Sequence, residues 1–187
     1  MPSPPERHRA WQTLLAARPP AWVPAHCGCV EALALAMCHC AESQGLAVDR
    51  NTVSAGALLH DIGRSRTQDV RHAGVGAEML RGLGGWDDRV VLCVERHTGA
   101  GIDEEEARFL GIPVKDYTPR SLEERIVCHA DNLYSGEKRL ALADVLAKYD
   151  AKGLGKAGRK IEALHRSLGR ELGADLETLE PLALSAP

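Results

Sequence analysis

Apolar residues recur at intervals of three and four along almost the whole chain, and this spacing decides the fold class. One such stripe joins His26, Val30, Leu33 and Met37. The interval is that of an amphipathic α-helix. Nowhere does a β-branched run alternate with polar residues over several positions, as a half-buried strand requires. The sequence therefore predicts an all-α fold, a helical bundle of roughly eight helices.

Capping residues predict where several of these helices begin and end. Asp49 is placed to cap a helix that carries His60 and Asp61 near its end and stops at Gly63. Ser121 and Glu124 have the spacing of a capping box for a later helix. Further helices are expected over about 4–17, from His26 to near Gly45, from His72 to Leu83, from Val90 to His97, and from Leu140 to Tyr149.

Charged runs elsewhere in the chain have ordinary structural interpretations. Asp103 to Glu106 holds four consecutive carboxylates, which is the usual chemistry of a helix start. The lysines at 148, 152, 156 and 160 recur every four residues and are interpreted as a solvated basic face. Gly153 to Gly158 matches G-x-G-x-x-G, but a helix rather than a strand is expected before it, so the match is interpreted as coincidence.

Charge and composition limit the classes of partner. A formal net charge of −3 is too close to zero for a protein that neutralises a phosphate backbone. Three Trp, three Tyr and one Phe are few for stacking single-stranded bases. We therefore expect no extended nucleic acid as a partner.

Hydrophobicity gives no sign of a membrane or of secretion. The longest apolar run near the N-terminus, Ala32 to Cys38, has seven residues, whereas a bilayer span needs about 20. Met1 to Arg9 lacks the apolar stretch of a signal peptide. A cytoplasmic protein without membrane contact is the expectation, and the oligomeric state is left open.

The six cysteines are expected to be reduced and not to bind zinc. Cys27 and Cys38 begin two C-x-C pairs, but they lie about 16 Å apart along the axis of one expected helix. Residues two positions apart on a helix point in different directions, so neither pair converges on one ion. We interpret these side chains as small buried hydrophobic groups.

Six residues combine a metal-binding side chain with a position on an apolar stripe. Burial of two carboxylates is costly without a partner, and no buried Lys or Arg is evident on these stripes. Imidazole and carboxylate together suit Fe, Mn, Co or Zn, and this number of ligands is about what two bridged metals require. The six residues are His26, His60, Asp61, His72, His97 and Asp131.

These residues resemble the HD-domain (HDIG) metal-dependent phosphohydrolases, most closely a subgroup of small stand-alone proteins. The similar region runs from His26 to about Tyr134 and includes the sequence His60-Asp61-Ile62-Gly63. The resemblance implies three segments: an N-terminal helix (1–22), the HD metal-binding domain (23–135) and a C-terminal helical appendage (136–187) packed on the same domain. It also implies that His26, His60, Asp61 and Asp131 bind a first metal, and that His72 and His97 bind a second one bridged by Asp61.

The resemblance implies hydrolysis of a phosphoester or phosphoanhydride in a small, nucleotide-like substrate. A hydroxide held between two metals at Asp61 would attack phosphorus, with Fe or Mn expected and Zn or Co as alternatives. Arg64 stands where the 5′-deoxynucleotidase branch has Glu, and the Gly-Tyr-Pro sequence of cyclic-di-GMP hydrolases is missing after His97. We expect Asp61 and Arg64 to be the catalytic residues. Arg64 is also expected to bind a phosphate oxygen of the substrate, and Thr98 and Lys115 are further candidates for substrate binding.

Two other functions are compatible with the same ligands. A few proteins of the HD fold use two irons to activate O₂, which would make this chain an oxygenase that requires iron. A non-catalytic metal-bound sensing module would turn over no phosphate ester.

Overall fold

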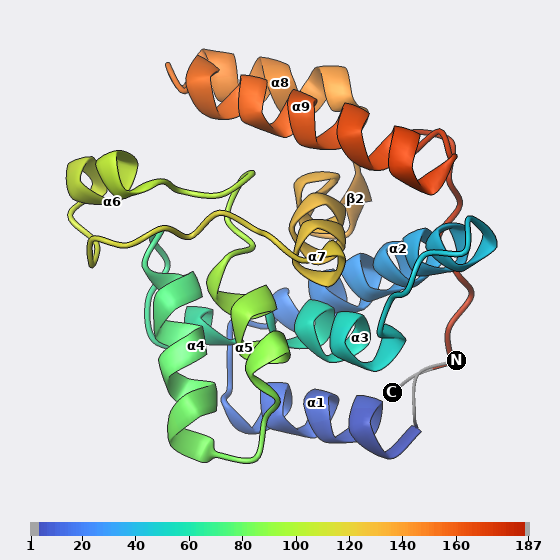
Figure 1. Cartoon of the computed structure of the whole chain (residues 1–187). Helices are drawn as coiled ribbons and strands as arrows, with labels where there is room; N and C mark the ends of the chain where they lie inside the picture. The colour runs from blue at the N-terminus through green and yellow to red at the C-terminus, as the bar shows by residue number, and fades with distance from the viewer. Residues whose placement is uncertain (1–3, 186–187) are drawn as a thin grey trace.

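The computed structural model describes residues 4–185 and confirms the all-α fold class. Figure 1 shows helices throughout, with only a two-stranded hairpin between α7 and α8. The elements are α1 (Pro4–Ala16), α2 (Val23–Ser43), α3 (Arg50–Leu59), the 3₁₀ turn η1 (Ile62–Ser65), α4 (His72–Leu83), α5 (Asp88–Glu95), α6 (Glu104–Leu110), α7 (Leu122–Asn132), β1 (Tyr134–Ser135), β2 (Lys138–Arg139), α8 (Leu142–Ala151) and α9 (Gly155–Leu172).

Helix α2 is the central element of the fold. Helices α3 and α7 pack along it, α1 covers α3 from below, and α8 and α9 lie across the top (Figure 1). By length and composition α2 alone among the described helices could cross a membrane, but most of it is buried inside the protein. It is therefore the core helix around which the others assemble.

The apolar core has two main clusters that meet at α2 and α3, and a small third one around α6. The upper cluster contains Leu33 and Met37 of α2 together with Ile126 of α7 and Leu168 of α9. The lower cluster joins α1, α4 and α5 to the other side of α3. Because α9 shares its cluster with α2 and α7, it packs against the helices that carry His26 and Asp131.

The helix that was expected to end at Gly63 ends instead at Leu59, and η1 follows. Gly63 does not serve as a left-handed helix cap here. A Cβ atom on Gly63 would lie 2.0 Å from the carbonyl oxygen of His72 and 2.7 Å from the backbone nitrogen of Gly76. The glycine is needed because η1 and the first turns of α4 touch backbone to backbone.

The capping expectations hold at three helices. Asp49 accepts hydrogen bonds from Asn51 and Thr52, and Asp103 forms a full capping box with Glu106. Ser121 caps α7, but the carboxylate of Glu124 accepts hydrogen bonds from Arg120 and Arg96 rather than from the Ser121 backbone. The helix that was expected to include His97 ends at Glu95.

The interpretation of the lysine series as a purely solvated face is wrong for two of its members. The Nζ atom of Lys160 lies 3.1 Å from an oxygen of Asp103 and 2.5 Å from one of Glu106. Lys156 pairs with the same two acids. These ion pairs join α9 to the start of α6, a tertiary contact that the sequence spacing does not reveal.

A buried ion pair ties α1 to the core. The guanidinium of Arg7 makes two hydrogen bonds, 2.7 and 2.9 Å long, to the carboxylate of Glu31, which is fully buried in α2. Ser54 of α3 donates a third hydrogen bond to the same carboxylate. The charge of Glu31 is thus compensated from two neighbouring helices.

We predict that Gly63→Ala destabilises the protein by about 3 kcal/mol, because a methyl group there collides with backbone atoms that cannot rotate away. The measurement is the free energy of unfolding from a denaturant titration. Gly28→Ala is the matched control, since Gly28 lies inside α2 with no atom within 4 Å of an added Cβ. That control should gain about 1 kcal/mol from helix propensity. Equal effects of the two substitutions would contradict the backbone contact.

We predict that Arg7→Met lowers the free energy of unfolding by about 3–5 kcal/mol, because it leaves the Glu31 carboxylate buried without a cation. The double variant Arg7→Met/Glu31→Leu removes both charges and should recover most of the loss. Thermal and denaturant unfolding of the three proteins provides the test. A double variant no more stable than the single one would show that the ion pair is not the cause.

Candidate metal centre

The six predicted ligands come together where five segments meet above the lower core. His26 lies in the second half of the first turn of α2, and Asp131 lies near the end of α7. His60 and Asp61 form the turn between α3 and η1, His72 is the first residue of α4, and His97 follows the end of α5. Helix ends therefore supply most of the cluster, and all four imidazoles are buried.

Each of the four imidazoles is oriented by a hydrogen bond from its Nδ1 atom to a backbone carbonyl. His60, His72 and His97 each donate over 2.7 Å to the carbonyl three residues earlier in the same turn. His26 donates over 2.8 Å to Gly136, in the hairpin after α7. A carbonyl can only accept, so the proton lies on Nδ1 and the Nε2 lone pair is left free, as in histidines that bind metals.

The free Nε2 atoms face one another in two pairs. The Nε2 atoms of His26 and His60 are 3.2 Å apart, and those of His72 and His97 are 2.9 Å apart. Lone pairs held this close in a buried site repel each other unless a cation lies between or beside them. The arrangement thus suits a positive charge at each pair.

The Asp61 carboxylate lies between the two pairs. Its Oδ2 atom is 3.9 Å from the Nε2 atom of His26 and 3.7 Å from that of His60. Its Oδ1 atom is 3.2 Å from the Nε2 atom of His72 and 3.7 Å from that of His97. Oδ1 is buried and receives no hydrogen bond from the described residues.

Asp131 adds a second carboxylate to one pair only. Its Oδ1 atom is 3.0 Å from the Nε2 atom of His26 and 3.5 Å from that of His60. Burial by itself raises the pKa of both Asp61 and Asp131, but the interactions with His60 and with the adjacent imidazoles outweigh it and hold both pKa values well below the usual range. Both carboxylates are therefore ionised.

Buried imidazole nitrogens and ionised carboxylate oxygens are a donor set for divalent transition metals. His26, His60 and Asp61 can share an ion, and so can Asp61, His72 and His97, because their ligand atoms lie within 4.8 Å of one another in each group. The residues present fit a divalent metal.

A cavity of about 280 Å³ opens above this cluster. Candidate ligand side chains line its floor, and its walls come from the start of α2, the residues after His97, the β1–β2 hairpin and α8. The structure thus gives the cluster access to a small molecule.

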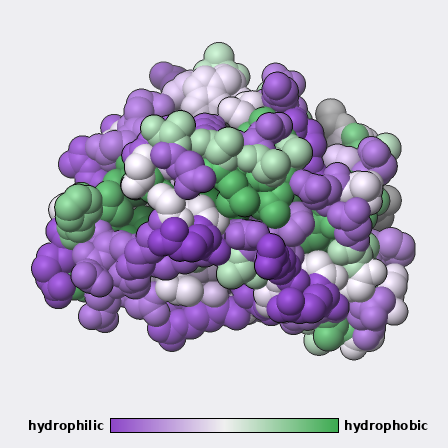
Figure 2. All heavy atoms as spheres, turned by 90° about the horizontal axis from the view of Figure 1, so that it is seen from above, coloured by the Kyte–Doolittle hydropathy of each residue, from purple (hydrophilic) through white to green (hydrophobic). Residues whose placement is uncertain are grey.

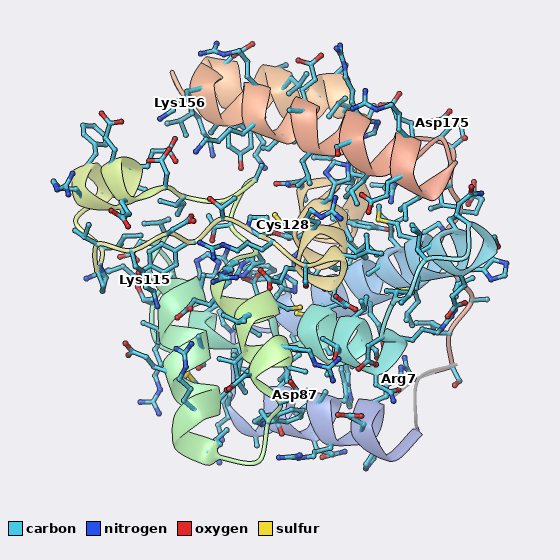
Figure 3. The ribbon with its side chains drawn as sticks, viewed as in Figure 1. Arg7, Asp87, Lys115, Cys128, Lys156 and Asp175 are labelled. Carbon is cyan, nitrogen blue, oxygen red and sulfur yellow. The ribbon has the colours of Figure 1, made fainter. Side chains whose placement is uncertain are left out.

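Of the three residues predicted to bind substrate, Arg64 and Thr98 line this cavity. The Nε atom of Arg64 lies 2.6 Å from Asp61 Oδ2. The hydroxyl oxygen of Thr98 is buried without a hydrogen-bond partner. Lys115 lies elsewhere, near the upper end of α4 (Figure 3), in a neighbouring cavity of about 220 Å³ where its Nζ atom is 2.6 Å from Glu95. The carboxylate of Glu95 holds Lys115 away from the cluster.

Sequence reasoning missed several residues that line the cavity, among them Trp22, Asn132, Lys148 and Tyr149. Asn132 donates a hydrogen bond to the carbonyl of Gly99 and so joins α7 to the segment after His97. Asn132 directly follows a predicted ligand, which is a usable signal. Trp22, Lys148 and Tyr149 belong to no motif, and only the packing of α8 and the start of α2 brings them here.

Comparison with known proteins finds the HD domain family, whose sequence model matches residues 26–136. The chain is 52% identical over 131 residues to the tRNA (cytidine(56)-2′-O)-methyltransferase of Thermoplasma volcanium and 51% identical over 131 residues to that of Picrophilus torridus. It is also 51% identical over 131 residues to an uncharacterised protein of Methanocaldococcus jannaschii. Each match covers 70% of this chain.

The matched segment makes up only 38% of each of the two methyltransferases but 76% of the Methanocaldococcus protein. Among solved structures, the HD domain of the phosphodiesterase PgpH of L. monocytogenes superposes with a TM-score of 0.48 at 16% identity, covering 89% of this chain and 98% of that one.

These relatives correct one expectation. The exclusion of extended nucleic acid as a partner is wrong, because the shared segment occurs in two relatives whose names give tRNA as the molecule they act on. Net charge and aromatic content describe the chain as a whole and do not register a local contact surface.

The family match includes all six clustered residues and extends over more than half of the 187 residues. The Methanocaldococcus relative matches at high identity over most of its own length. The chain belongs to the HD domain family.

Proposed function

We propose that this protein is a metal-dependent phosphohydrolase that cleaves a phosphoester or phosphoanhydride of a nucleotide-like substrate. The observation that carries the proposal is the convergence of four Nε2 lone pairs on the two oxygens of one buried carboxylate, Asp61. Two divalent transition metals, Fe or Mn with Zn or Co as alternatives, would be held by His26, His60, Asp61 and Asp131 on one side and by Asp61, His72 and His97 on the other.

Metal ions in such a site would lower the pKa of bound water toward neutrality and neutralise charge on phosphoryl oxygens. Asp61 and Asp131 contribute two negative charges that balance part of the metal charge. The Nδ1 hydrogen bonds keep the four imidazoles in the ligating orientation, so little reorganisation accompanies substrate binding.

Arg64 is the residue best placed to bind a phosphate oxygen next to the cluster. Its guanidinium contacts Asp61 through Nε and leaves donors on its terminal nitrogens, one of which lies 3.3 Å from His72 Nε2. A planar guanidinium binds phosphate through two parallel donors. Thr98, which lines the same cavity, can donate its unpaired hydroxyl to another phosphate oxygen. Lys115 has no part in this proposal because Glu95 holds it in the other cavity.

The names of the relatives widen the range of substrates. Two proteins that share the segment are named for an action on tRNA. The proposed substrates therefore include a tRNA, through a nucleotide at its end, as well as a free nucleotide. Both carry a phosphate next to a ribose. The substrate screen therefore includes free nucleotides, cyclic phosphates and tRNA.

Two alternatives predict different observations. A di-iron oxygenase consumes O₂ and requires iron, whereas a hydrolase also works with Mn or Co. A sensing module binds metal but releases no phosphate from any ester. Oxygen uptake and phosphate release, measured on the same metal-loaded preparations, separate the three functions.

We predict about two metal ions per chain after reconstitution with Fe or Mn and removal of unbound ions. Asp61→Ala removes the shared ligand and should abolish binding at both positions, while His72→Ala should lower the content to about one. Elemental analysis gives the number. His39→Ala, which changes an exposed histidine of α2 outside the cluster, should have no effect. Unchanged metal content in Asp61→Ala would refute the bridged arrangement.

We predict that Arg64→Ala lowers kcat/KM for phosphoester hydrolysis about 100-fold while the metal content stays the same, because one charged donor to the phosphate is lost. Arg64→Lys keeps the charge without the planar fork and should recover only part of the activity. Steady-state kinetics with the best substrate of the screen measures both. Full activity in Arg64→Ala would remove Arg64 from substrate binding.

A further inference from the structure

The cavity beside the candidate metal centre is also lined by side chains that are not candidate ligands. Trp22 stands at the start of α2, and Lys148 and Tyr149 stand in the second half of α8. Helix α8 is part of the layer that covers the top of the molecule in Figure 1. Seen from above, this layer has a mostly hydrophilic surface with hydrophobic patches between its polar side chains (Figure 2).

Trp22 is unusual because its indole is 44% exposed and belongs to neither of the two main apolar clusters. Trp86, by contrast, packs against the lower cluster and is covered by the guanidinium of Arg9 at 4.1 Å. The ring centroid of Trp22 lies 5.8 Å from that of His26, and the Cζ atom of Arg64 lies 5.5 Å from the Trp22 ring. The indole therefore adjoins both the metal cluster and its nearest cation.

Lys148 brings a second cation to the cavity. Within the part of the chain that the structure describes, its ammonium group has no ion-pair partner. Lys156 and Lys160, from the same series of lysines, are both paired with acids. Because Lys148 lines the cavity from α8 and Arg64 from η1, the two cations come from different walls.

Tyr149 contributes a hydrogen-bond donor beside Lys148. Its hydroxyl would lie 3.6 Å from a Cβ atom on Gly99, two residues after His97. Burial, and then the negative charge of Asp131, raises the pKa of Tyr149 to about 12, so the hydroxyl keeps its proton at neutral pH.

We infer that this cavity binds one nucleotide unit, with the base stacked on Trp22 and the phosphate between Arg64 and Lys148. This inference rests on the proposed function and specifies its substrate class. The unit is either a free nucleoside monophosphate or the terminal nucleotide of an RNA.

Three physical features support this assignment. An exposed indole is a stacking surface for any base. Two cations from separate walls match the charge of a phosphate monoester. A volume of about 280 Å³ suits a single nucleotide and not a longer segment, which would have to remain outside.

The experiment compares two ligands that differ only in the base. Isothermal titration of the Mn-loaded protein measures the affinity of AMP and of ribose 5-phosphate, and free phosphate is assayed in the same samples. Trp22→Leu should weaken AMP binding about tenfold through lost stacking and leave ribose 5-phosphate unchanged. Trp22→Phe keeps an aromatic ring and should retain most of the affinity.

Lys148→Gln tests the phosphate half of the assignment. This variant should weaken both ligands about tenfold, because a charged contact to the phosphate is lost. Lys152→Gln is the matched control, because Lys152 directly follows the last residue of α8 and is exposed and outside the cavity lining. It should bind both ligands as the unmodified protein does.

The results separate this inference from the proposed function. Equal losses for AMP and ribose 5-phosphate in Trp22→Leu, or no loss for either, would overturn base stacking. No loss of affinity in Lys148→Gln would overturn the phosphate contact.

Binding that follows the expected pattern without any release of phosphate supports the nucleotide site and refutes hydrolysis of this ligand. If tRNA displaces AMP, the bound unit is the terminal nucleotide of an RNA; if it does not, the unit is a free nucleotide. In either case the expected losses of affinity in Trp22→Leu and Lys148→Gln support the nucleotide site.

Discussion

The buried carboxylate of Asp61 is the constraint on which the rest of the site depends. An ionised carboxylate inside a protein costs several kcal/mol unless a positive charge compensates it. Arg64 contacts only Oδ2, and Oδ1 faces the nitrogen lone pairs of His72 and His97. The four imidazoles carry their protons on Nδ1, which points away from Asp61. As neutral rings they supply no positive charge to Oδ1. The geometry is therefore that of a site completed by metal.

The fold meets this constraint with helix ends. His60 and His97 follow the last residues of α3 and α5, where carbonyl groups three residues back have no partner within the helix. These carbonyls accept the Nδ1 protons, so one hydrogen bond both satisfies the helix end and orients the ligand. Gly63 then lets η1 approach α4 closely enough to bring His72 to Asp61. Stability at the helix ends and ligand geometry have the same structural cause.

The helices and the candidate ligand residues could be read from the sequence because both depend on local spacing, and the fold brings these residues together. Asp49, Asp103 and Ser121 cap the helices they were expected to cap, since a cap acts on backbone groups two or three residues away. The end of α3 was misplaced because the reason for Gly63 is a contact with α4, which no local pattern contains. The basic face of α9 was misinterpreted for the same reason, as its acidic partners lie on α6. The exclusion of nucleic acid failed because it relied on averages over the whole chain.

The sequence by itself determined the all-α class, most of the helix starts and the six candidate ligand side chains that the fold brings together. These follow from periodicity and from residue types whose burial needs a cation. Only the tertiary structure decided that Asp61 lies between two histidine pairs, that Lys115 is held by Glu95 in a second cavity, and that Trp22 and Lys148 face the cluster. The physical reason is distance along the chain: α8 and the start of α2 are separated by more than a hundred residues, and only the packing of the core brings both to the lining of one cavity.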